Sequence, residues 1–486
     1  METKNIGNLL KGVDGYELNG KRDVIVRGLA LDSRKVESGF LFAALKGYEV
    51  DGHRYIDKAI EAGAIVILCT ELPALQSSKV TYIKVADTRE AIGAIADNYY
   101  DYPSKNISCI GITGTNGKTS IATLLYNLFK ELGYKVGLIS TIEILVNEEK
   151  WKAELTTPDV LRLHQLMAEM VESDCSHVFM EVSSHAVDQR RIAGLDFDIG
   201  VFTNLTHDHL DYHGSFKAYI AAKQLFFTGL SDTAKAIINI DDKHGEIMVE
   251  RSKANVLRFS SRRLTDYKVK LLGDGRSGML LDVNGFQFMT RLSGDYNAMN
   301  LAAVFAVADQ LLEDETLTVI EKLSGLRGAK GRLEVVHYEP RVIVDYAHTP
   351  DALSNLLGSL KDSLDGGRLI TVVGCGGDRD RSKRPKMASE AYKFSDVLIL
   401  TSDNPRSEDP DSIIKDMLTG LEGKDKRKIL DIVDRRSAIK TAMTICENID
   451  TIVIAGKGHE EYQEIKGKRH FFSDQQIVKD ILSNDI

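Results

Sequence analysis

Proline and cysteine are both scarce in this chain of 486 residues. Only 8 prolines occur, which excludes a collagen-like chain and, together with 43% hydrophobic residues, argues against a disordered one. The cysteines lie far apart and form no CxxC pair, so we expect neither a cysteine-based zinc site nor a disulfide framework. We expect reduced, mostly buried thiols at the five positions, Cys69, Cys109, Cys175, Cys375 and Cys446.

A surplus of basic residues and a long apolar run are also absent. Lys and Arg number 62 against 71 Asp and Glu, and the formal net charge is -9. Without a broad positive field, the chain is not expected to bind nucleic acid. No stretch approaches the roughly 18 uninterrupted apolar residues of a membrane span, and the N-terminus has no cleavable hydrophobic region. We therefore expect a cytoplasmic protein without a membrane partner, and a monomer.

Short β-rich runs alternate with helical patterns in three successive sets. The first set covers 24–101 and ends before 102–106, a polar segment with a turn-forming proline. Such alternation predicts mostly parallel sheets with helices on both faces, and the length favours about three domains. The expected class is α/β, with a small N-terminal α/β domain at 1–104, a central phosphate-loop, parallel-sheet ATPase domain at 105–332 and a C-terminal Rossmann-like domain at 333–486.

The sharpest local signal is a glycine-rich turn between a buried strand at 107–113 and a helical pattern from 121. Its sequence, GITGTNGKTS, runs from Gly111 to Ser120. Glycines let backbone N–H groups surround phosphate oxygens, while Lys118 adds a charge and the Thr119 hydroxyl can bind Mg²⁺. The strict phosphate-loop pattern would need glycine where this chain has Ile112. We predict a nucleoside triphosphate site; an ordinary glycine-rich turn is the alternative.

Two later segments, 180–185 and 203–213, end or follow hydrophobic strands. Because ligands bind at the carboxyl ends of strands in parallel sheets, both segments are expected to face the phosphate loop. Glu181 and His209 within them are plausible ligands for a divalent cation beside a triphosphate. Taken singly, each could instead be a helix cap or a core residue.

Together with the phosphate loop, these segments resemble the Mur ligase family, the ATP-dependent amide-forming enzymes that build the peptide stem of peptidoglycan. The resemblance extends over nearly the whole chain. It rests on residues 32–34 with 39–47, 114–120, 156–158, 181–185, 209–213, 294–300, 331–332, 344–350 and 403–406. It implies a UDP-binding first domain, an ATP-binding middle domain and a third domain that receives the incoming amino acid.

The resemblance also implies residue roles. The expected ATP-binding residues are Gly114, Thr115, Asn116, Gly117, Lys118, Thr119, Ser120, Asn297, Arg332 and Asp345. The expected contacts of the UDP-muramoyl dipeptide are Ser33, Thr156, Thr157, Ser183, Gln189 and Arg191. The expected amino-acid-binding residues are Arg379, Asp403, Asn404, Pro405, Arg406, Gly456 and Glu460. The expected catalytic residues are Lys118, Glu181, His209 and Lys223, with Lys223 carbamylated to N6-carboxylysine, and the expected Mg²⁺ ligands are Thr119, Glu181 and His209.

The implied reaction joins an amino acid to the D-glutamyl carboxylate of UDP-N-acetylmuramoyl-L-alanyl-D-glutamate. ATP would first convert that carboxylate into an acyl phosphate, which the amine then attacks. Arg406 offers a planar fork for a carboxylate and would repel the ammonium tip of lysine, so meso-2,6-diaminopimelate is the expected amino acid. The alternative for this segment is a proline-containing turn with a surface arginine.

Three alternative functions stay open at this point. One is a lysine-adding ligase of the same scaffold, and another is folylpolyglutamate synthase, whose related architecture lacks the N-terminal UDP-binding unit. The third is a phosphate-loop regulatory ATPase that uses hydrolysis only to change shape. The basic run 379–384 alternates with acidic residues, so it is expected to serve an anionic substrate or to be a solvated loop.

Overall fold

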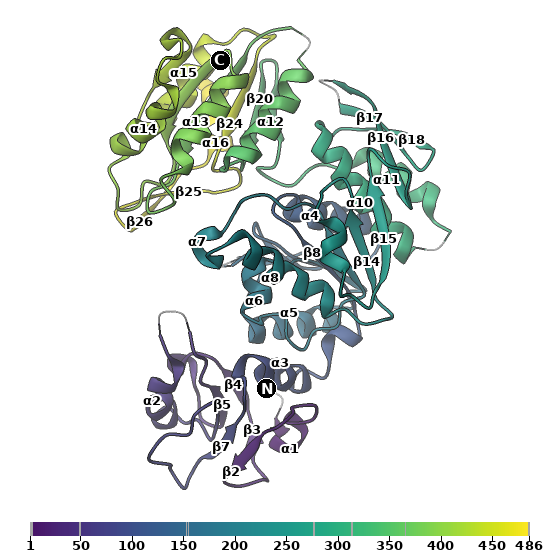
Figure 1. Ribbon diagram of the computed structural model, residues 1–486, viewed down its shortest axis with the longest axis vertical. Coiled ribbons are helices and arrows are strands. Elements are labelled where there is room, and N and C mark those ends of the chain that lie inside the picture. The colour runs from purple at the N-terminus through teal and green to yellow at the C-terminus, as the bar shows by residue number, and fades with distance from the viewer. Residues whose placement is uncertain are drawn as a thin grey trace.

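A computed structural model of the protein describes residues 3–47, 50–151, 153, 155–275, 278–312, 314–364 and 366–484. They form three bodies arranged along the longest axis, with the N-terminal elements in purple at one end and the C-terminal elements in green and yellow at the other (Figure 1). Each body has its own sheet. The α/β class with a three-part architecture is confirmed.

The N-terminal body is built on a five-stranded sheet with the order β2-β7-β6-β5-β4. β4 to β7 are parallel and β2 pairs antiparallel at one edge. The strands are β2 (Glu17–Asn19), β4 (Gly28–Ala30), β5 (Phe40–Ala43), β6 (Val66–Cys69) and β7 (Thr81–Lys84). The helices are α1 (Ile6–Leu9), α2 (Ile56–Glu61) and α3 (Thr88–Tyr99). The expected run at 24–31 is split, because β3 (Ile25–Val26) leaves this sheet to pair with β1 (Lys4–Asn5).

The middle body has an eleven-stranded sheet with the order β11-β10-β9-β12-β8-β13-β14-β15-β16-β17-β18. Its parallel centre consists of β8 (Ser108–Thr113), β9 (Val136–Ile139), β12 (His177–Glu181), β13 (Ile199–Phe202), β14 (Lys235–Asn239), β15 (Asn255–Ser260) and β16 (Tyr267–Gly275). Antiparallel partners extend both edges, namely β10 (Ile144–Val146), β11 (Glu149–Trp151), β17 (Gly278–Val283) and β18 (Phe286–Thr290). Because β8 lies between β12 and β13, the segments that follow these three strands meet at one edge.

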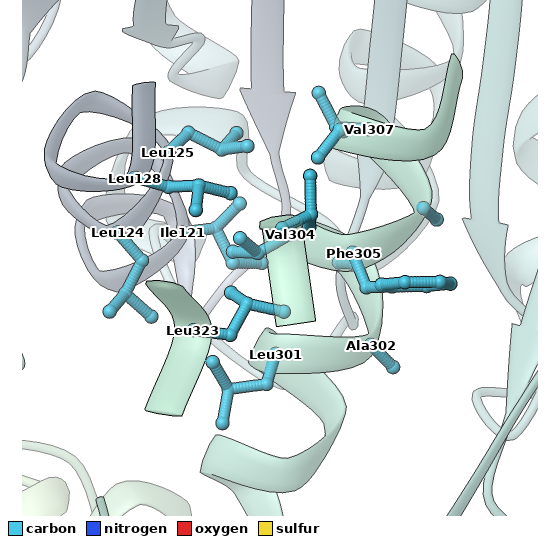
Figure 2. Close-up of a cluster of buried hydrophobic side chains, with 14 of the residues drawn as sticks. Ile121, Leu124, Leu125, Leu128, Leu301, Ala302, Val304, Phe305, Val307 and Leu323 are labelled. Atoms are coloured by element: carbon cyan, nitrogen blue, oxygen red, sulfur yellow. The ribbon is translucent and has the colours of Figure 1, made fainter. Parts of the chain in front are cut away.

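Helices cover both faces of the middle sheet, which explains why β8 is buried along nearly its whole length. On one face α4 (Lys118–Glu131) packs against α10 (Asp295–Leu311) and α11 (Thr316–Gly325), and Figure 2 shows Leu125 and Leu128 of α4 near Val304 of α10. On the other face lie α5 (Val160–Glu172) and α8 (Phe216–Thr228). Three short helices complete this body: α6 (Ser184–Asp188), α7 (Leu210–His213) and α9 (Gly245–Val249).

The C-terminal body has a six-stranded sheet with the order β19-β20-β24-β21-β22-β23, parallel except at β19. The strands are β19 (Glu334–Tyr338), β20 (Arg341–Asp345), β21 (Leu369–Cys375), β22 (Val397–Ser402), β23 (Ile429–Asp431) and β24 (Thr451–Ala455). The helices α12 (Pro350–Asp362), α13 (Lys383–Phe394) and α14 (Pro410–Leu418) cover one face, and α15 (Arg435–Ile445) and α16 (Asp474–Asn484) the other. A hairpin of β25 (Tyr462–Ile465) and β26 (Lys468–Phe471) follows β24.

The connections between the bodies are short. Tyr102 has a positive φ of 56° and precedes the 3-10 helix η3 (Pro103–Lys105), after which β8 begins. The second connection precedes β19. The expected limits 1–104, 105–332 and 333–486 fall in these connections and stay predictions. In the part of the chain that the structure describes, no helix is both long and apolar enough to cross a bilayer.

Candidate functional site

The predicted phosphate loop lies between β8 and α4, where two glycines adopt backbone angles that other residues avoid. Gly114 has a φ of 149° and Gly117 a φ of 90°. The Lys118 side chain folds back over the loop, donating hydrogen bonds to the carbonyl oxygens of Gly114 at 3.0 Å and Thr115 at 2.8 Å. Burial lowers the pKa of Lys118, while the negative charges of Glu181 and Asp208 oppose this shift. The loop therefore presents its lysine at a helix N-terminus, as a phosphate site requires.

The segment that follows β13 holds the loop in this shape. Asn204 accepts hydrogen bonds from the backbone N–H of Thr115 at 2.8 Å, through its carbonyl oxygen, and from that of Asn116 at 2.9 Å, through its side chain. The Thr203 hydroxyl donates to the carbonyl of Asn116 at 2.6 Å. These contacts join residues that are 87 to 89 positions apart in the chain.

Lys223 lies on α8 and is buried beneath the same loop. Its Nζ donates to the carbonyl oxygen of Gly114 at 2.8 Å, so two lysines share one acceptor. Burial, reinforced by the charge of Lys118, lowers the pKa of Lys223 well below its usual value. A neutral amine is the form of lysine that can react with CO₂, and this position therefore has the chemistry that a carbamate needs.

Glu181 and His209 lie at the same edge of the sheet. Glu181, the last residue of β12, is buried and accepts a hydrogen bond from the Thr141 N–H at 2.7 Å. His209 has a φ of 53°, and its Nε2 lies 3.6 Å from Oδ2 of Asp208. Burial lowers the pKa of His209 to about 4, an effect that the Asp208 carboxylate opposes. Its imidazole is therefore neutral near pH 7 and keeps a lone pair for a cation.

No hydrogen bond or ion pair joins the three expected Mg²⁺ ligands, Thr119, Glu181 and His209, to one another. The Thr119 hydroxyl accepts a hydrogen bond from Nη2 of Arg332 at 3.3 Å, while Glu181 and His209 have the other partners described above. Among the described residues, no group of three or more His, Cys, Asp and Glu side chains is arranged to hold a metal ion. A carboxylate, an imidazole and a hydroxyl fit Mg²⁺ only as part of a shell completed by phosphate oxygens and water.

The residues expected near the nucleotide come from both sides of a body junction. Arg332 stacks on the ring of Tyr346 at 4.5 Å and reaches Thr119 in the middle body. Asp345 ends β20, and its carboxylate accepts from the N–H of Leu333 at 2.6 Å and of Ala347 at 2.7 Å. Burial raises the pKa of Asp345, and the positive charge of Arg332 opposes this rise.

Asn297 approaches the phosphate loop indirectly. Its Oδ1 accepts from Nδ2 of Asn300 at 3.1 Å. The amide oxygen Oδ1 of Asn300 lies close to Gly117: a Cβ added to Gly117 would be 2.7 Å from it. α10 therefore orients an amide toward the turn of the loop, with Asn297 supporting it. Ser120, the second residue after Lys118, lies in the first turn of α4.

Five of the six residues expected to bind the muramoyl dipeptide form one hydrogen-bonded network beside Glu181. The Thr157 hydroxyl donates to the Glu181 carbonyl at 2.8 Å and approaches the Ser183 hydroxyl at 3.4 Å. Arg191 donates to the carbonyl of Thr157 at 2.8 Å and, through Nη2, to Oε1 of Gln189 at 2.7 Å. Thr156 joins through the Thr141 hydroxyl, at 3.1 Å.

Ser33, the sixth, lies apart in the N-terminal body. It begins the 3-10 helix η1 (Ser33–Lys35) after β4, with Asp32 as the N-cap. The two bodies are connected by Arg89 of α3, whose guanidinium donates to the carbonyl oxygens of Lys46 at 2.8 Å and Gln189 at 3.3 Å. Arg89 was not expected from the sequence, where it looks like an ordinary charged residue of a helix.

The amino-acid loop, residues 403–406, follows β22 at the carboxyl edge of the C-terminal sheet. Arg406 has a φ of 52°, its Nη1 donates to the Gly377 carbonyl at 2.6 Å, and its Nε lies 3.9 Å from Oε2 of Glu464. Asn404 donates to Oε2 of Glu460 at 2.8 Å. The Arg406 side chain is thus three-quarters buried, and it does not extend freely into solvent.

The neighbouring residues of this set are packed tightly. A Cβ on Gly456 would lie 2.7 Å from Oδ2 of Asp403, and one on Gly377 would lie 2.0 Å from the Pro405 carbonyl oxygen. Arg379 is exposed in the loop after β21 that contains Gly377. The structure therefore brings all seven expected residues to one edge of the C-terminal sheet.

The basic run 379–384 agrees with the expectation of a solvated loop only in part, because residues 379–382 are exposed whereas Lys383 and Arg384 begin α13. Arg384 is buried, with Nη1 and Nη2 donating to the two oxygens of Glu408 and Nη1 also reaching Asp416 at 2.8 Å. Lys383 crosses to the middle body and donates to Oδ1 of Asp208 at 3.2 Å. Burial would raise the pKa of Asp208, but the charges of His209, Lys383 and His348 lower it to about 2, so the Asp208 carboxylate is ionised near pH 7.

Three family models match successive parts of the chain. "Mur ligase family, catalytic domain" matches residues 25–100, "Mur ligase middle domain" 112–308, and "Mur ligase, glutamate ligase domain" 331–458. Two relatives are named UDP-N-acetylmuramoyl-L-alanyl-D-glutamate--2,6-diaminopimelate ligase. The one from Phocaeicola vulgatus is 49% identical over 98% of this chain and 99% of its own, and the one from Aquifex aeolicus is 42% identical over 95% and 94%.

Solved structures agree in fold. A structure with the same ligase name is 33% identical, with a TM-score of 0.70 over 96% of this chain and 97% of that one. Folylpolyglutamate synthase from Mycobacterium tuberculosis, solved with ADP and AMPPCP, has a TM-score of 0.60 over 74% of this chain and 91% of its own. At 19% identity, that second likeness concerns the fold alone.

The phosphate loop gives a first test. Gly117→Ala should weaken binding of an adenine nucleotide by about tenfold or more, because the new Cβ meets Asn300 and the positive φ is strained. Calorimetric titration with ADP measures the effect. Gly133→Ala is the matched control: Gly133 has the same φ of 90°, but open space lies around its Cβ position, and binding should stay within about twofold. Equal losses in both variants would contradict the prediction.

The Lys383 to Asp208 ion pair gives a second test. Lys383→Met should loosen the contact between the C-terminal and middle bodies and increase the radius of gyration in small-angle X-ray scattering, because a partly buried pair contributes about 1 kcal/mol or more. The control is Lys361→Met, which removes a 2.6 Å pair with Asp396 inside the C-terminal body. An unchanged scattering profile for Lys383→Met would show that the pair does not hold the bodies together.

Proposed function

Because the chain belongs to the Mur ligase family, we propose that it joins meso-2,6-diaminopimelate to the D-glutamyl carboxylate of UDP-N-acetylmuramoyl-L-alanyl-D-glutamate, using ATP. The relatives with this activity in their name are similar over nearly the full chain. One structural observation carries the proposal. The Lys383 to Asp208 contact brings the C-terminal body, which would bind the amino acid, against segment 203–213 beside the phosphate loop. A reaction that joins two substrates needs such an approach, whereas ATP hydrolysis alone does not.

The first chemical step is the transfer of the γ-phosphoryl group. An oxygen of the D-glutamyl carboxylate attacks the γ-phosphorus, the bond to the β-phosphate oxygen breaks, and ADP and an acyl phosphate result. Lys118, which donates to loop carbonyls, would turn its N–H groups toward the phosphate oxygens and offset their charge. Arg332 lies beside Thr119 in the first turn of α4, where it can offset charge on the same group.

The second step forms the amide bond. The neutral amine of the incoming amino acid attacks the acyl carbon, a tetrahedral intermediate forms, and inorganic phosphate leaves as the amine loses a proton. The substrates sit on different bodies, so their alignment depends on the contacts across the junctions. The network from Thr157 to Arg191 would bind the dipeptide next to Glu181, and the Arg406 loop would present the amine from the opposite side.

Mg²⁺ fits this site as a partner of ATP, held by Thr119, Glu181 and His209. It would neutralise charge on the phosphate oxygens and polarise the γ-phosphoryl group. The buried carboxylate and the neutral imidazole support this assignment. We also propose that Lys223 carries a carbamate, since a burial-neutralised amine under the loop can take up CO₂. The cytoplasmic location and the monomeric state remain predictions.

One assay separates the candidate functions. The protein is incubated with ATP, Mg²⁺ and the UDP-muramoyl dipeptide, and phosphate release and product mass are followed with diaminopimelate, with lysine or without an amino acid. Product with diaminopimelate, and at least about tenfold less with lysine, is expected because Arg406 favours a distal carboxylate. Phosphate release that does not depend on the acceptor would favour a regulatory ATPase, and preference for lysine would favour the lysine-adding ligase.

Arg406→Ala should lower kcat/KM for diaminopimelate on the order of 100-fold, because the variant loses a charge-assisted, bidentate contact to the distal carboxylate. ATP binding should stay within about twofold, because the loop lies in the C-terminal sheet. Steady-state kinetics and ADP titration measure both quantities. Arg427→Ala, which removes an exposed arginine of the same body, is the control. A similar loss of ATP binding in Arg406→Ala would count against this role.

A further inference from the structure

A fully buried lysine lies under the amino-acid loop. Lys457 follows β24, between Gly456 and Gly458, and its side chain has 0% exposure. Its Nζ donates to Oδ1 of Asn404 at 3.1 Å and to Oε2 of Glu460 at 3.1 Å, and it lies 3.6 Å from Oδ1 of Asp403. A buried ammonium is costly unless it is paired, so these contacts must persist in the folded protein.

Lys457 connects residues from two separate chain segments. Asp403 and Asn404 follow β22, whereas Glu460 follows β24. Asn404 contacts both Lys457 and Glu460, and its Oδ1 also accepts from the N–H of Glu464 at 2.9 Å. The ammonium therefore lies at the centre of a polar cluster that orients the loop carrying Arg406.

The charge of Lys457 also matters for what this cluster can bind. Asp403 and Glu460 are like charges that would repel one another without a cation between them. Arg435 also interacts electrostatically with both carboxylates, but its guanidinium is paired with buried Asp474 at 2.7 Å and forms no ion pair with Asp403 or Glu460. Lys457 thus holds two carboxylates in one place and offsets part of their negative charge.

We propose that Lys457 is a positioning residue for amino-acid selection, which orients Asp403, Asn404 and Glu460 and sets the charge of the pocket to suit a distal group with both an ammonium and a carboxylate. The inference rests on the proposed function for the identity of that amino acid. An amino acid ending in a bare ammonium carries one more positive charge. Loss of the Lys457 charge makes the pocket more negative. The preference for an amino acid whose distal end carries both an ammonium and a carboxylate, over one that ends in an ammonium alone, should then decrease.

The test uses Lys457→Met, which keeps the side-chain length and removes the charge. A second variant, Lys457→Gln, removes the charge but keeps a hydrogen-bond donor, and it is used if Lys457→Met does not fold. KM for diaminopimelate should rise on the order of 100-fold, because a buried carboxylate pair is left without its cation. The ratio of kcat/KM for diaminopimelate to that for lysine should fall by at least about tenfold. KM for ATP should stay within about twofold, because the phosphate loop lies in another body.

The control is Arg368→Met. Arg368 also pairs with a buried carboxylate, Asp450, at 2.7 Å, but it lies at the amino end of β21, away from the loops. This variant should leave KM and the diaminopimelate-to-lysine ratio unchanged. The same kinetic changes in Arg368→Met, or an unchanged ratio in both Lys457 variants, would overturn the proposal.

A crystal structure of a Lys457 variant without substrate provides a readout that does not depend on the reaction. Asn404 and Glu460 should be displaced relative to the wild-type crystal structure, and unmoved side chains would overturn the positioning role. If the wild-type enzyme made no product from diaminopimelate, the proposed function would fail. The displacement of Asn404 and Glu460 would still test the positioning role of Lys457 on its own.

Discussion

A buried lysine and a partly buried lysine converge on a single carbonyl oxygen and set the conditions for the nucleotide site. Lys118 and Lys223 both donate to the Gly114 carbonyl, and burial lowers the pKa of each. Two ammonium groups bonded to the same carbonyl oxygen would repel one another, and the repulsion is stronger in a site shielded from water. The arrangement is stable with one amine neutral, and it becomes more favourable when an anion is present. A triphosphate beside Lys118 and a carbamate on Lys223 each provide such an anion.

The remaining geometry follows from this loop and from the strand order around it. β8 lies between β12 and β13. Glu181, which ends β12, and Asn204, which accepts hydrogen bonds from the loop backbone, therefore approach the phosphate loop from opposite sides. The dipeptide network then begins directly at the Glu181 backbone, through Thr157. The contacts across the body junctions are of both kinds: Arg89 to Gln189 and Lys383 to Asp208 are polar, whereas Val160 of α5 packs into the hydrophobic cluster of the N-terminal body.

In the proposed function, amino-acid selectivity depends on the C-terminal body, whereas the phosphate loop lies in the middle body. Related folds with 17 to 19% identity share the architecture, and such a likeness carries no information about the amino acid. The loop with Arg406 is supported by Lys457, which donates to Asn404 of the loop, and Glu408, which forms an ion pair with Arg384, lies just after the loop in the chain. In the proposed function, Lys457 and Arg384 hold residues that would contact the substrate, and a change in either of these two cations would alter recognition indirectly.

The sequence alone determined the α/β class, the three sets of strands and helices and the phosphate loop, because glycine positions and hydrophobic periodicity act over short distances. It also placed Glu181 and the 403–406 loop at strand ends, from which their gathering at sheet edges followed. Only the tertiary structure decided the partners of buried charges. Lys383 meets Asp208 from 175 positions away, and Lys457 meets Asn404 from 53. The first pair depends on how two bodies pack against one another, and the second on how β22 and β24 are ordered within one sheet, and no local pattern encodes either arrangement.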